Sequence, residues 1–222
     1  MDRRRRDFKK VFLFSNFSLE KWINFCLDKT IFYILRDNKI VKLNRITFRN
    51  FIKRGYKDYK ATFEDFELHM QSIWTDIRIK EQYIEWRSFD TMPPGLVMAA
   101  PALTKRILYG SKKVKDAIED LVKNWTFNDI QKLRRQVYIK ALQTQHNGKK
   151  MLDYAKELLN IVDDSLKSFE ILNEDKQDES IYLDSLKDYI LVKEQSPAEY
   201  ALEQWNSAWR KDPRKLIEWC AY

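Results

Sequence analysis

The chain has 222 residues, enough for one substantial domain or for part of a larger one, and only four of them are glycine. A hydrophobic fraction of 44% with 14% aromatic residues favours a packed, mostly helical protein over a disordered one, and no apolar run approaches the roughly 18 to 20 residues that cross a membrane. The formal charge of +8 comes from 41 basic and 33 acidic residues, a balance that fits anionic substrates, nucleic acid or plain solubility.

The first residues combine a basic cluster, Arg3 to Arg6, with a short apolar patch, Val11 to Phe14. They lack the apolar core and the cleavage site of a signal peptide. Such a basic tail can bind nucleic acid or an anionic surface, and this alternative stays open. Two cysteines, Cys26 and Cys220, form neither a disulfide framework nor a metal-ligand pattern, so we expect a reduced, cytoplasmic protein.

Short helices and strands alternate in the first part of the chain. Apolar residues at helical spacing follow three capping residues, so helices should begin after Ser18, Thr47 and Thr62. Between the first two helices, short strands at 31–35 and 40–43 flank turn-favouring residues and predict a hairpin. Cys26 lies on an apolar stripe, which favours a core residue over a nucleophile. His69 is interpreted as partly buried and hydrogen-bonded; the alternative is a ligand or base.

The stretch YIEWRSFDTMPP, Tyr83 to Pro94, predicts a buried strand from about Ile79 to Asp90 that ends at a proline-marked turn. On a regular strand Glu85 and Arg87 share one face, roughly 7 Å apart at about 3.3 Å per residue, and Asp90 points to the other. The pair fits an ordinary structural ion pair. It also fits a site in which the carboxylate holds Mg2+ and the guanidinium binds phosphate, because each group matches that ligand chemically.

The remainder of the chain is helical in pattern. Residues 96–109 predict a buried helix that Pro101 bends and Gly110 ends. Apolar stripes and caps predict further helices at 114–122, after Thr126, at 151–166, from Ser196 through Trp209 and after Asp212. Aromatic residues interleave with basic ones, but most lie on core stripes, which favours packing over stacking on nucleic-acid bases.

Three segments in order, Glu85-Trp-Arg-Ser-Phe-Asp90, Ala100-Pro-Ala-Leu103 and Arg106-Ile-Leu-Tyr109, resemble the proteobacterial and plant type of glutamate-cysteine ligase. Further segments agree in the same order, namely 19–28, 46–51, 76–80, 142–144, Trp205, Asp212-Pro213 and the closing Ala-Tyr. The resemblance implies an α+β chain. Residues 1–110 would form part of the antiparallel sheet of a glutamine-synthetase-like ligase fold, and 111–222 a mostly helical region of the same domain.

The same resemblance implies an ATP-dependent enzyme that joins glutamate to cysteine through a glutamyl phosphate, the first step of glutathione biosynthesis. Carried over by motif, Glu85 is the Mg2+ ligand and Arg87 contacts the phosphate end of ATP or the acyl phosphate. Asp90 matches the family motif and would have a supporting role in the site. Arg78 and Lys80 also match the family pattern, but no role is assigned to them. Such chemistry needs no protein nucleophile, so the lack of a Ser-His-Asp or Cys-His constellation is expected.

The chain departs from the family by lacking an acidic Gly-x-Glu-x-Glu-like strand that supplies further metal ligands in related enzymes. The resemblance therefore covers the C-terminal half alone. We expect little activity without a partner polypeptide that carries the N-terminal half, and we expect no membrane association. Two alternatives stay open: a non-catalytic remnant that acts in binding or regulation, and a basic nucleic-acid-binding protein.

Overall fold

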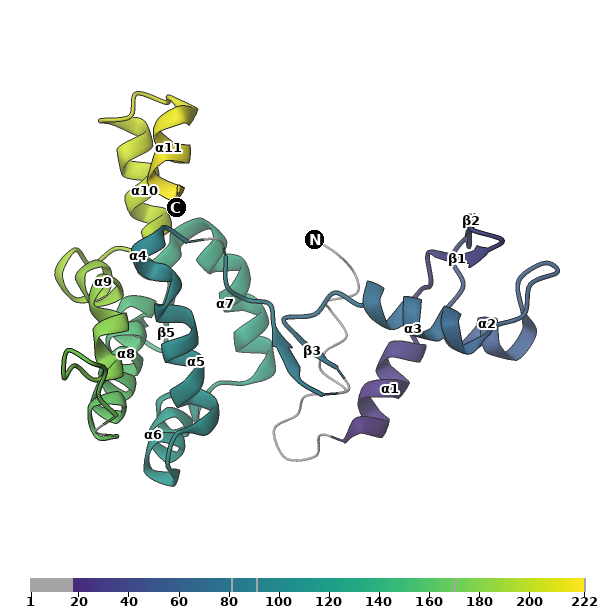
Figure 1. Cartoon of the computed structure of the whole chain (residues 1–222), viewed down its shortest axis with the longest axis horizontal. Helices are drawn as coiled ribbons and strands as arrows, with labels where there is room; N and C mark the ends of the chain where they lie inside the picture. The colour runs from purple at the N-terminus through teal and green to yellow at the C-terminus, as the bar shows by residue number, and fades with distance from the viewer. Residues whose placement is uncertain (1–17, 81, 91, 170, 222) are drawn as a thin grey trace. The chain divides into compact units, whose positions relative to one another are not determined.

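The computed structural model describes residues 18–80, 82–90, 92–169 and 171–221, so the basic cluster Arg3 to Arg6 lies outside them (Figure 1). The described residues fall into two compact units, one that ends at Phe89 and one that begins at Asp90. Among the described residues, the first unit has two hydrophobic clusters and the second unit has one. The class is α+β, as predicted, whereas the ligase fold and the division into 1–110 and 111–222 stay predictions.

The first unit contains three short helices, α1 (Leu19–Leu27), α2 (Phe48–Arg54) and α3 (Phe63–Ser72). All three begin where the sequence predicts. Each follows a serine or threonine whose side chain accepts a hydrogen bond from the backbone N–H three residues on, which satisfies a donor that the helix itself leaves unpaired. Gly55, with a φ of 71°, ends α2 in a conformation that other residues rarely adopt.

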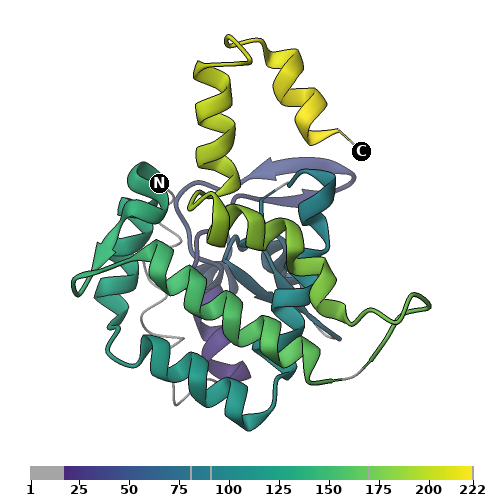
Figure 2. The same ribbon diagram turned by 90° about the vertical axis from the view of Figure 1, so that its left-hand side faces the viewer.

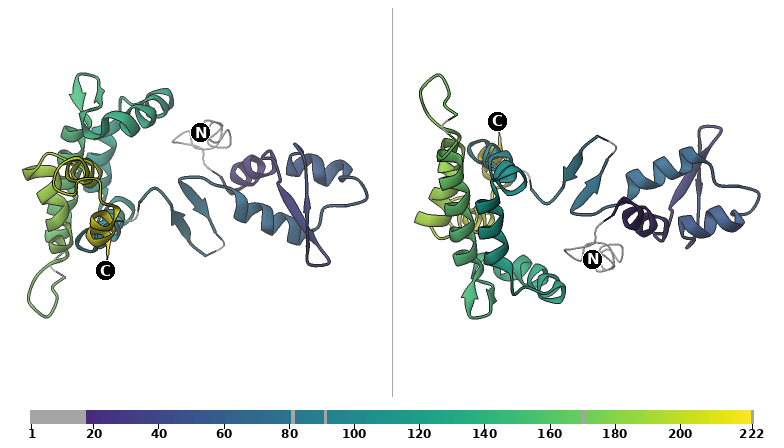
Figure 3. Two further views of the ribbon diagram at one scale, coloured as in Figure 1. Left: turned by 90° about the horizontal axis from the view of Figure 1, so that it is seen from above. Right: turned by 90° about the horizontal axis from the view of Figure 1, so that it is seen from below.

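The strands of this unit form two separate antiparallel hairpins. The first pairs β1 (Tyr33–Arg36) with β2 (Lys39–Lys42), and its turn residues Asp37 and Asn38 have positive φ, as a tight hairpin requires. Figure 3 shows the second, in which β3 (Ile77–Ile79) pairs with β4 (Ile84–Trp86). Each hairpin is a two-stranded sheet, so the described residues contain no larger sheet.

The predicted long buried strand from Ile79 to Asp90 is wrong. The chain reverses inside it, where the Lys80 N–H donates to the Tyr83 carbonyl at 2.9 Å, and β4 keeps only three residues. The side chains of Tyr83 and Ile84 are 60% and 61% exposed. Strand propensity alone favoured burial, but a two-stranded hairpin does not cover both of its faces.

The second unit is almost wholly helical. Its α-helices are α4 (Pro94–Val97), α5 (Ala99–Tyr109), α6 (Lys112–Val122), α7 (Phe127–Lys140), α8 (Met151–Lys167), α9 (Asp184–Lys187), α10 (Pro197–Asn206) and α11 (Pro213–Cys220). Helical segments of other types are η2 (Ala141–Gln143), η3 (Glu179–Leu183) and η4 (Asp188–Val192), and the small hairpin β5 (Gln145–His146) and β6 (Lys149–Lys150) precedes α8. The long helix α8 lies against α5 and α6 (Figure 2).

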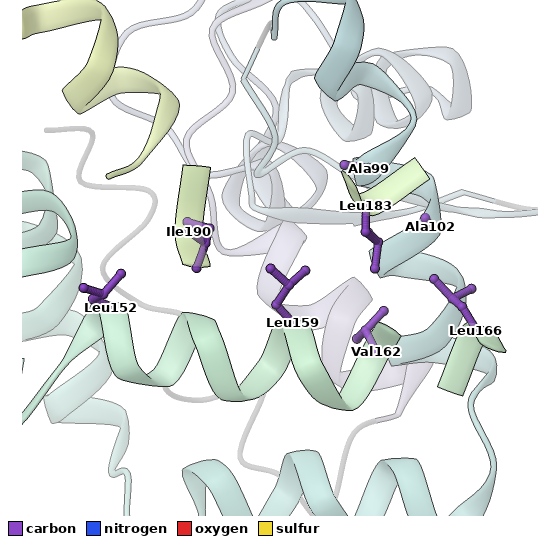
Figure 4. Packing of buried hydrophobic residues seen from close by; sticks show 8 residues of the cluster. All are labelled: Ala99, Ala102, Leu152, Leu159, Val162, Leu166, Leu183 and Ile190. Carbon is purple, nitrogen blue, oxygen red and sulfur yellow. The ribbon is translucent and has the colours of Figure 1, made fainter. Parts of the chain in front are cut away.

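The core of this unit lies between α8 and α5. Figure 4 shows α8 presenting Leu152, Leu159, Val162 and Leu166 toward Ala99, Ala102, Leu183 and Ile190. These α8 positions recur at helical spacing and form the stripe that the sequence predicts. Within the described residues, none of the helices has the length and apolar character needed to span a membrane.

Two helix boundaries in this unit differ from their predictions. Met98 separates α4 from α5, so the expected single helix is interrupted at this residue, and Pro101 lies in the first turn of α5. Proline at this position lacks the N–H for a bond to the Val97 carbonyl, and its ring crowds that carbonyl. The helix after Ser196 ends at Asn206 and not at Trp209. The predicted stop of α5 at Gly110 is confirmed.

Candidate functional site

The β3–β4 hairpin places Glu85 between two arginines. Arg78 stands opposite Glu85 in the register, and its Nε donates to Glu85 Oε2 at 2.8 Å while its Nη2 donates to the same oxygen. On the other side, Arg87 Nε lies 3.2 Å from Glu85 Oε1. Glu85 and Arg87 therefore meet on one face, as the strand spacing predicts, and both carboxylate oxygens are engaged.

The guanidinium of Arg87 is held by an aromatic ring as well. Its central carbon lies 3.6 Å from the centroid of Trp74, a cation–π contact, and the Arg87 side chain is only 13% exposed. The Arg87 backbone N–H donates to the Asp76 carbonyl at 2.7 Å. Arg87 Nη1 is buried without a hydrogen-bond partner among the described residues. An unmet buried donor is costly, and an oxygen acceptor could satisfy this nitrogen only where a small movement of the side chain exposes it.

The electrostatics of the hairpin favour an anion. The hydrogen bond from Arg78 is the main cause that holds the pKa of Glu85 below its ordinary value, and the charges of Arg78, Arg87 and Lys80 act in the same direction. Three cationic side chains thus surround one carboxylate. A phosphate group, which arginine forks match in shape and charge, fits such a surface.

Whether Mg2+ fits these residues depends on whether the ion is free or bound to nucleotide phosphates. Among the residues that the structure describes, no three Asp, Glu, His or Cys side chains gather as a metal cluster. A bare Mg2+ would meet one carboxylate and two guanidiniums, so it does not fit. Mg2+ that accompanies nucleotide phosphates needs only one or two protein carboxylates, and Glu85, 30% exposed, would supply one by sharing an oxygen that Arg78 or Arg87 also contacts.

The remaining predicted residues lie outside this cluster. Asp90 is exposed and lies beyond the end of β4. It therefore is not part of the strand, and the predicted position on the strand face opposite Glu85 does not apply. The core prediction for Cys26 is confirmed: its side chain is fully buried, and burial raises the pKa of the thiol to about 12. His69 is more buried than predicted, stacks on Phe48 at 4.9 Å, and its Nε2 lies 2.8 Å from the Cys26 carbonyl oxygen.

Sequence reasoning missed the contacts of Arg78 and Trp74. Both depend on the chain reversal at Lys80, which brings β3 beside β4. A turn recognised at that point would have placed Arg78 directly across from Glu85, since opposite-charge pairs commonly face each other in antiparallel strands.

The family model and the similar known proteins point to the same family. The family model of glutamate-cysteine ligase family 2 matches residues 1–218. Over 212 residues the chain is 26% identical to "Glutamate--cysteine ligase, chloroplastic" of Medicago truncatula, which covers 93% of this chain and 40% of the relative. The protein of the same name from Arabidopsis thaliana is 26% identical over 210 residues, covering 93% of this chain and 38% of the relative. The chain therefore spans well under half the length of these relatives.

Proposed function

Since the chain belongs to glutamate-cysteine ligase family 2, we propose that it forms part of an ATP-dependent ligase that joins glutamate to cysteine. In the proposed reaction, a side-chain carboxylate oxygen of glutamate attacks the terminal phosphorus of ATP, and ADP leaves. The cysteine amine then attacks the acyl carbon of the glutamyl phosphate, and phosphate leaves with the bonding electron pair. The amine loses a proton, and the product is gamma-glutamylcysteine, the first intermediate of glutathione biosynthesis.

The observation that carries this proposal is the cluster of charged side chains on the β3–β4 hairpin, in which Arg78 and Arg87 both form ion pairs with Glu85. Phosphoryl transfer depends on placing the phosphate and stabilising the charge on its oxygens. Arg87 is held by Trp74 and keeps an unmet donor at Nη1, so we assign it the phosphate contact. Glu85 would hold Mg2+ bound to the nucleotide, and that ion supplies neutralisation of phosphate charge.

We further propose that other carboxylates complete the site from a polypeptide segment outside the described residues, carried by a partner chain. One glutamate is too few for the metal ions of a phosphoryl-transfer site. We propose a cytoplasmic location because both cysteines are free, Cys26 buried and Cys220 half-buried. The relatives are named as chloroplastic, so for this chain the compartment stays a prediction.

The test is an assay of the protein isolated from its source cells with whatever co-purifies. With glutamate, cysteine, ATP and Mg2+, we expect ADP and gamma-glutamylcysteine in equal amounts. Arg87→Lys keeps the charge but loses the fork, and we expect kcat/KM to fall by about a hundredfold. The matched control is Arg54→Lys at an exposed position of α2, which should leave the rate unchanged.

Two outcomes would favour the alternatives. If the isolated protein makes no product and Glu85→Ala leaves the cellular phenotype intact, the chain acts in binding or regulation and not in catalysis. If the protein is retained on DNA or RNA in a salt-dependent way, and neutralising Arg3 to Arg6 abolishes the retention, nucleic acid is its ligand.

A further inference from the structure

An apolar groove opens in the helical unit between α7 and the start of α8. It has a volume of about 240 Å³, and its apolar lining consists of Trp125, Ile130, Leu133, Val137, Tyr138 and Met151. Small-molecule sites usually measure roughly 300 to 1,000 Å³ and carry several converging polar groups. Arg134 is the one charged residue in this lining. The groove is thus suited to a single bulky apolar side chain.

The floor of the groove is held in place. The Trp125 ring contacts the rings of His146 and Tyr154 edge-on, with centroids 5.1 and 5.0 Å away, and Lys149 lies over Tyr154 at 4.4 Å. A preformed pocket lowers the ordering cost of binding, and tryptophan, tyrosine and arginine are the residue types that dominate binding energy at interfaces.

The last turn of α7 presents apolar side chains to solvent beside this groove. Val137, Tyr138 and Ile139 are 37%, 68% and 85% exposed. Val137 and Tyr138 belong to the groove lining, and Ile139 adds exposed apolar surface on the adjoining side of the helix. Contiguous exposed apolar surface rimmed by polar groups is typical of an interaction site.

The charge around the groove is positive overall, although Lys149 pairs with Glu157 at 2.5 Å and the Lys150 backbone N–H donates to Asp153. Residues 126–151 contain six lysines or arginines and one acidic residue, Asp129, whose carboxylate accepts hydrogen bonds from Thr126 at the start of α7. Arg135 and Lys140 are exposed, lie three residues from Tyr138 and Val137, and form no ion pair with the described residues. Side chains at this spacing are neighbours on a helix surface, so both cations border the groove.

We propose that this groove docks an amphipathic segment of a protein partner, which inserts one bulky apolar side chain and carries acidic residues beside it. A second copy of the chain would bring the same positive face and repel. The chain's own N-terminal residues contain Arg3 to Arg6, Lys9 and Lys10, so charge also opposes them as the occupant. The proposal does not depend on ligase activity.

The test is site-specific photo-cross-linking of the full chain in its source cells with Tyr138→p-benzoylphenylalanine. We expect the mapped cross-link to fall on an apolar residue with acidic residues within one helical turn of it. The matched control is Tyr182→p-benzoylphenylalanine, an exposed tyrosine in η3, which should give no such product. The double charge reversal Arg135→Glu with Lys140→Glu should lower the Tyr138 yield about tenfold.

Both reversed residues are exposed, so the double variant should fold, and its circular dichroism spectrum checks this. The control reversal Lys113→Glu, on exposed α6, should leave the yield unchanged. Cross-links to a second copy, to residues 1–17 or to nucleic acid would overturn the proposal. A yield no higher than that of the Tyr182 control, or one that the charge reversal does not change, would overturn it equally.

Discussion

The carboxylate of Glu85 accepts its strongest contacts from Arg78 on the neighbouring strand, and this contact is the main reason that its pKa is lowered. Replacing Arg78 by glutamine should therefore raise the pKa of Glu85 toward its ordinary value. A lowered pKa stabilises the hairpin above the ordinary pKa, and that stabilisation is lost as pH falls through the lowered value. In Arg78→Gln the hairpin should therefore gain less from ionisation of Glu85.

The measurement is a titration of the Glu85 carboxyl carbon by nuclear magnetic resonance, in the wild type and in Arg78→Gln. Lys80→Gln is the control, because Lys80 lowers the pKa of Glu85 through its charge alone and less than Arg78 does. Its shift should be the smaller of the two. Equal pKa shifts in both variants would show that the Arg78–Glu85 hydrogen bond between the strands does not determine the pKa of Glu85.

At the scale of single residues, the sequence predicts the contacts between residues that are close together in the chain. Alternation along a strand puts Glu85 and Arg87 on one face, and the structure agrees. Trp74 and Arg78 could not be predicted, because their contacts need a turn that the apolar run concealed. Cys26 could be predicted as a core residue because a helical stripe depends only on spacing.

At the scale of an element, the start of α3 combines a cap with a charge pair. Asp65 is 3% exposed, accepts two hydrogen bonds from Arg36 at 2.8 and 2.6 Å, and accepts one from the Thr62 N–H at 3.0 Å. Burial raises the pKa of Asp65, but the bonds from Arg36 and Thr62 outweigh it, so the pKa ends below the ordinary value. This carboxylate joins α3 to β1.

Asp65→Ala should lower the free energy of unfolding by about 3 kcal/mol, since it leaves Arg36 partly buried without its carboxylate. Urea unfolding near neutral pH measures the change. Glu67→Ala, an exposed carboxylate in the same helix, is the control and should stay within about 0.5 kcal/mol of the wild type. The loss in Asp65→Ala should shrink at acid pH, where the wild type also loses the charge. A loss independent of pH would contradict the role of the ion pair.

Helix starts were predictable because a cap is a property of four neighbouring residues, as Thr62 and Ser196 show. The end of α10 was not. Arg210 and Lys211 have positive φ in the turn before α11, a conformation that sequence rules reserve for glycine and asparagine. The prediction that β4 is buried was wrong for a related reason, because the exposure of a strand residue depends on which elements pack against the strand.

At the scale of the whole molecule, the described residues form two units, the first with two clusters of buried side chains and the second with one. The cluster of the second unit draws all its members from residues after Asp90, with Leu159 and Val162 of α8 at its centre (Figure 4). A core made wholly within one stretch of chain predicts that the stretch can fold alone. The comparatively local contacts of helices also favour independent folding.

We therefore expect residues 90–222, produced without the first unit, to show a helical circular dichroism spectrum and a cooperative urea transition. Leu159→Ala, in this shortened chain, should lower the free energy of unfolding by about 2 to 5 kcal/mol, because Leu159 is 3% exposed and its loss leaves a cavity. Leu202→Ala on α10 is the control, since Leu202 is 61% exposed and its removal should cost about 0.5 kcal/mol or less. A helical spectrum without a cooperative transition, or equal losses for both leucines, would show that these helices need the rest of the chain to pack. Partner binding through α7 would then have to be sought in the intact chain alone.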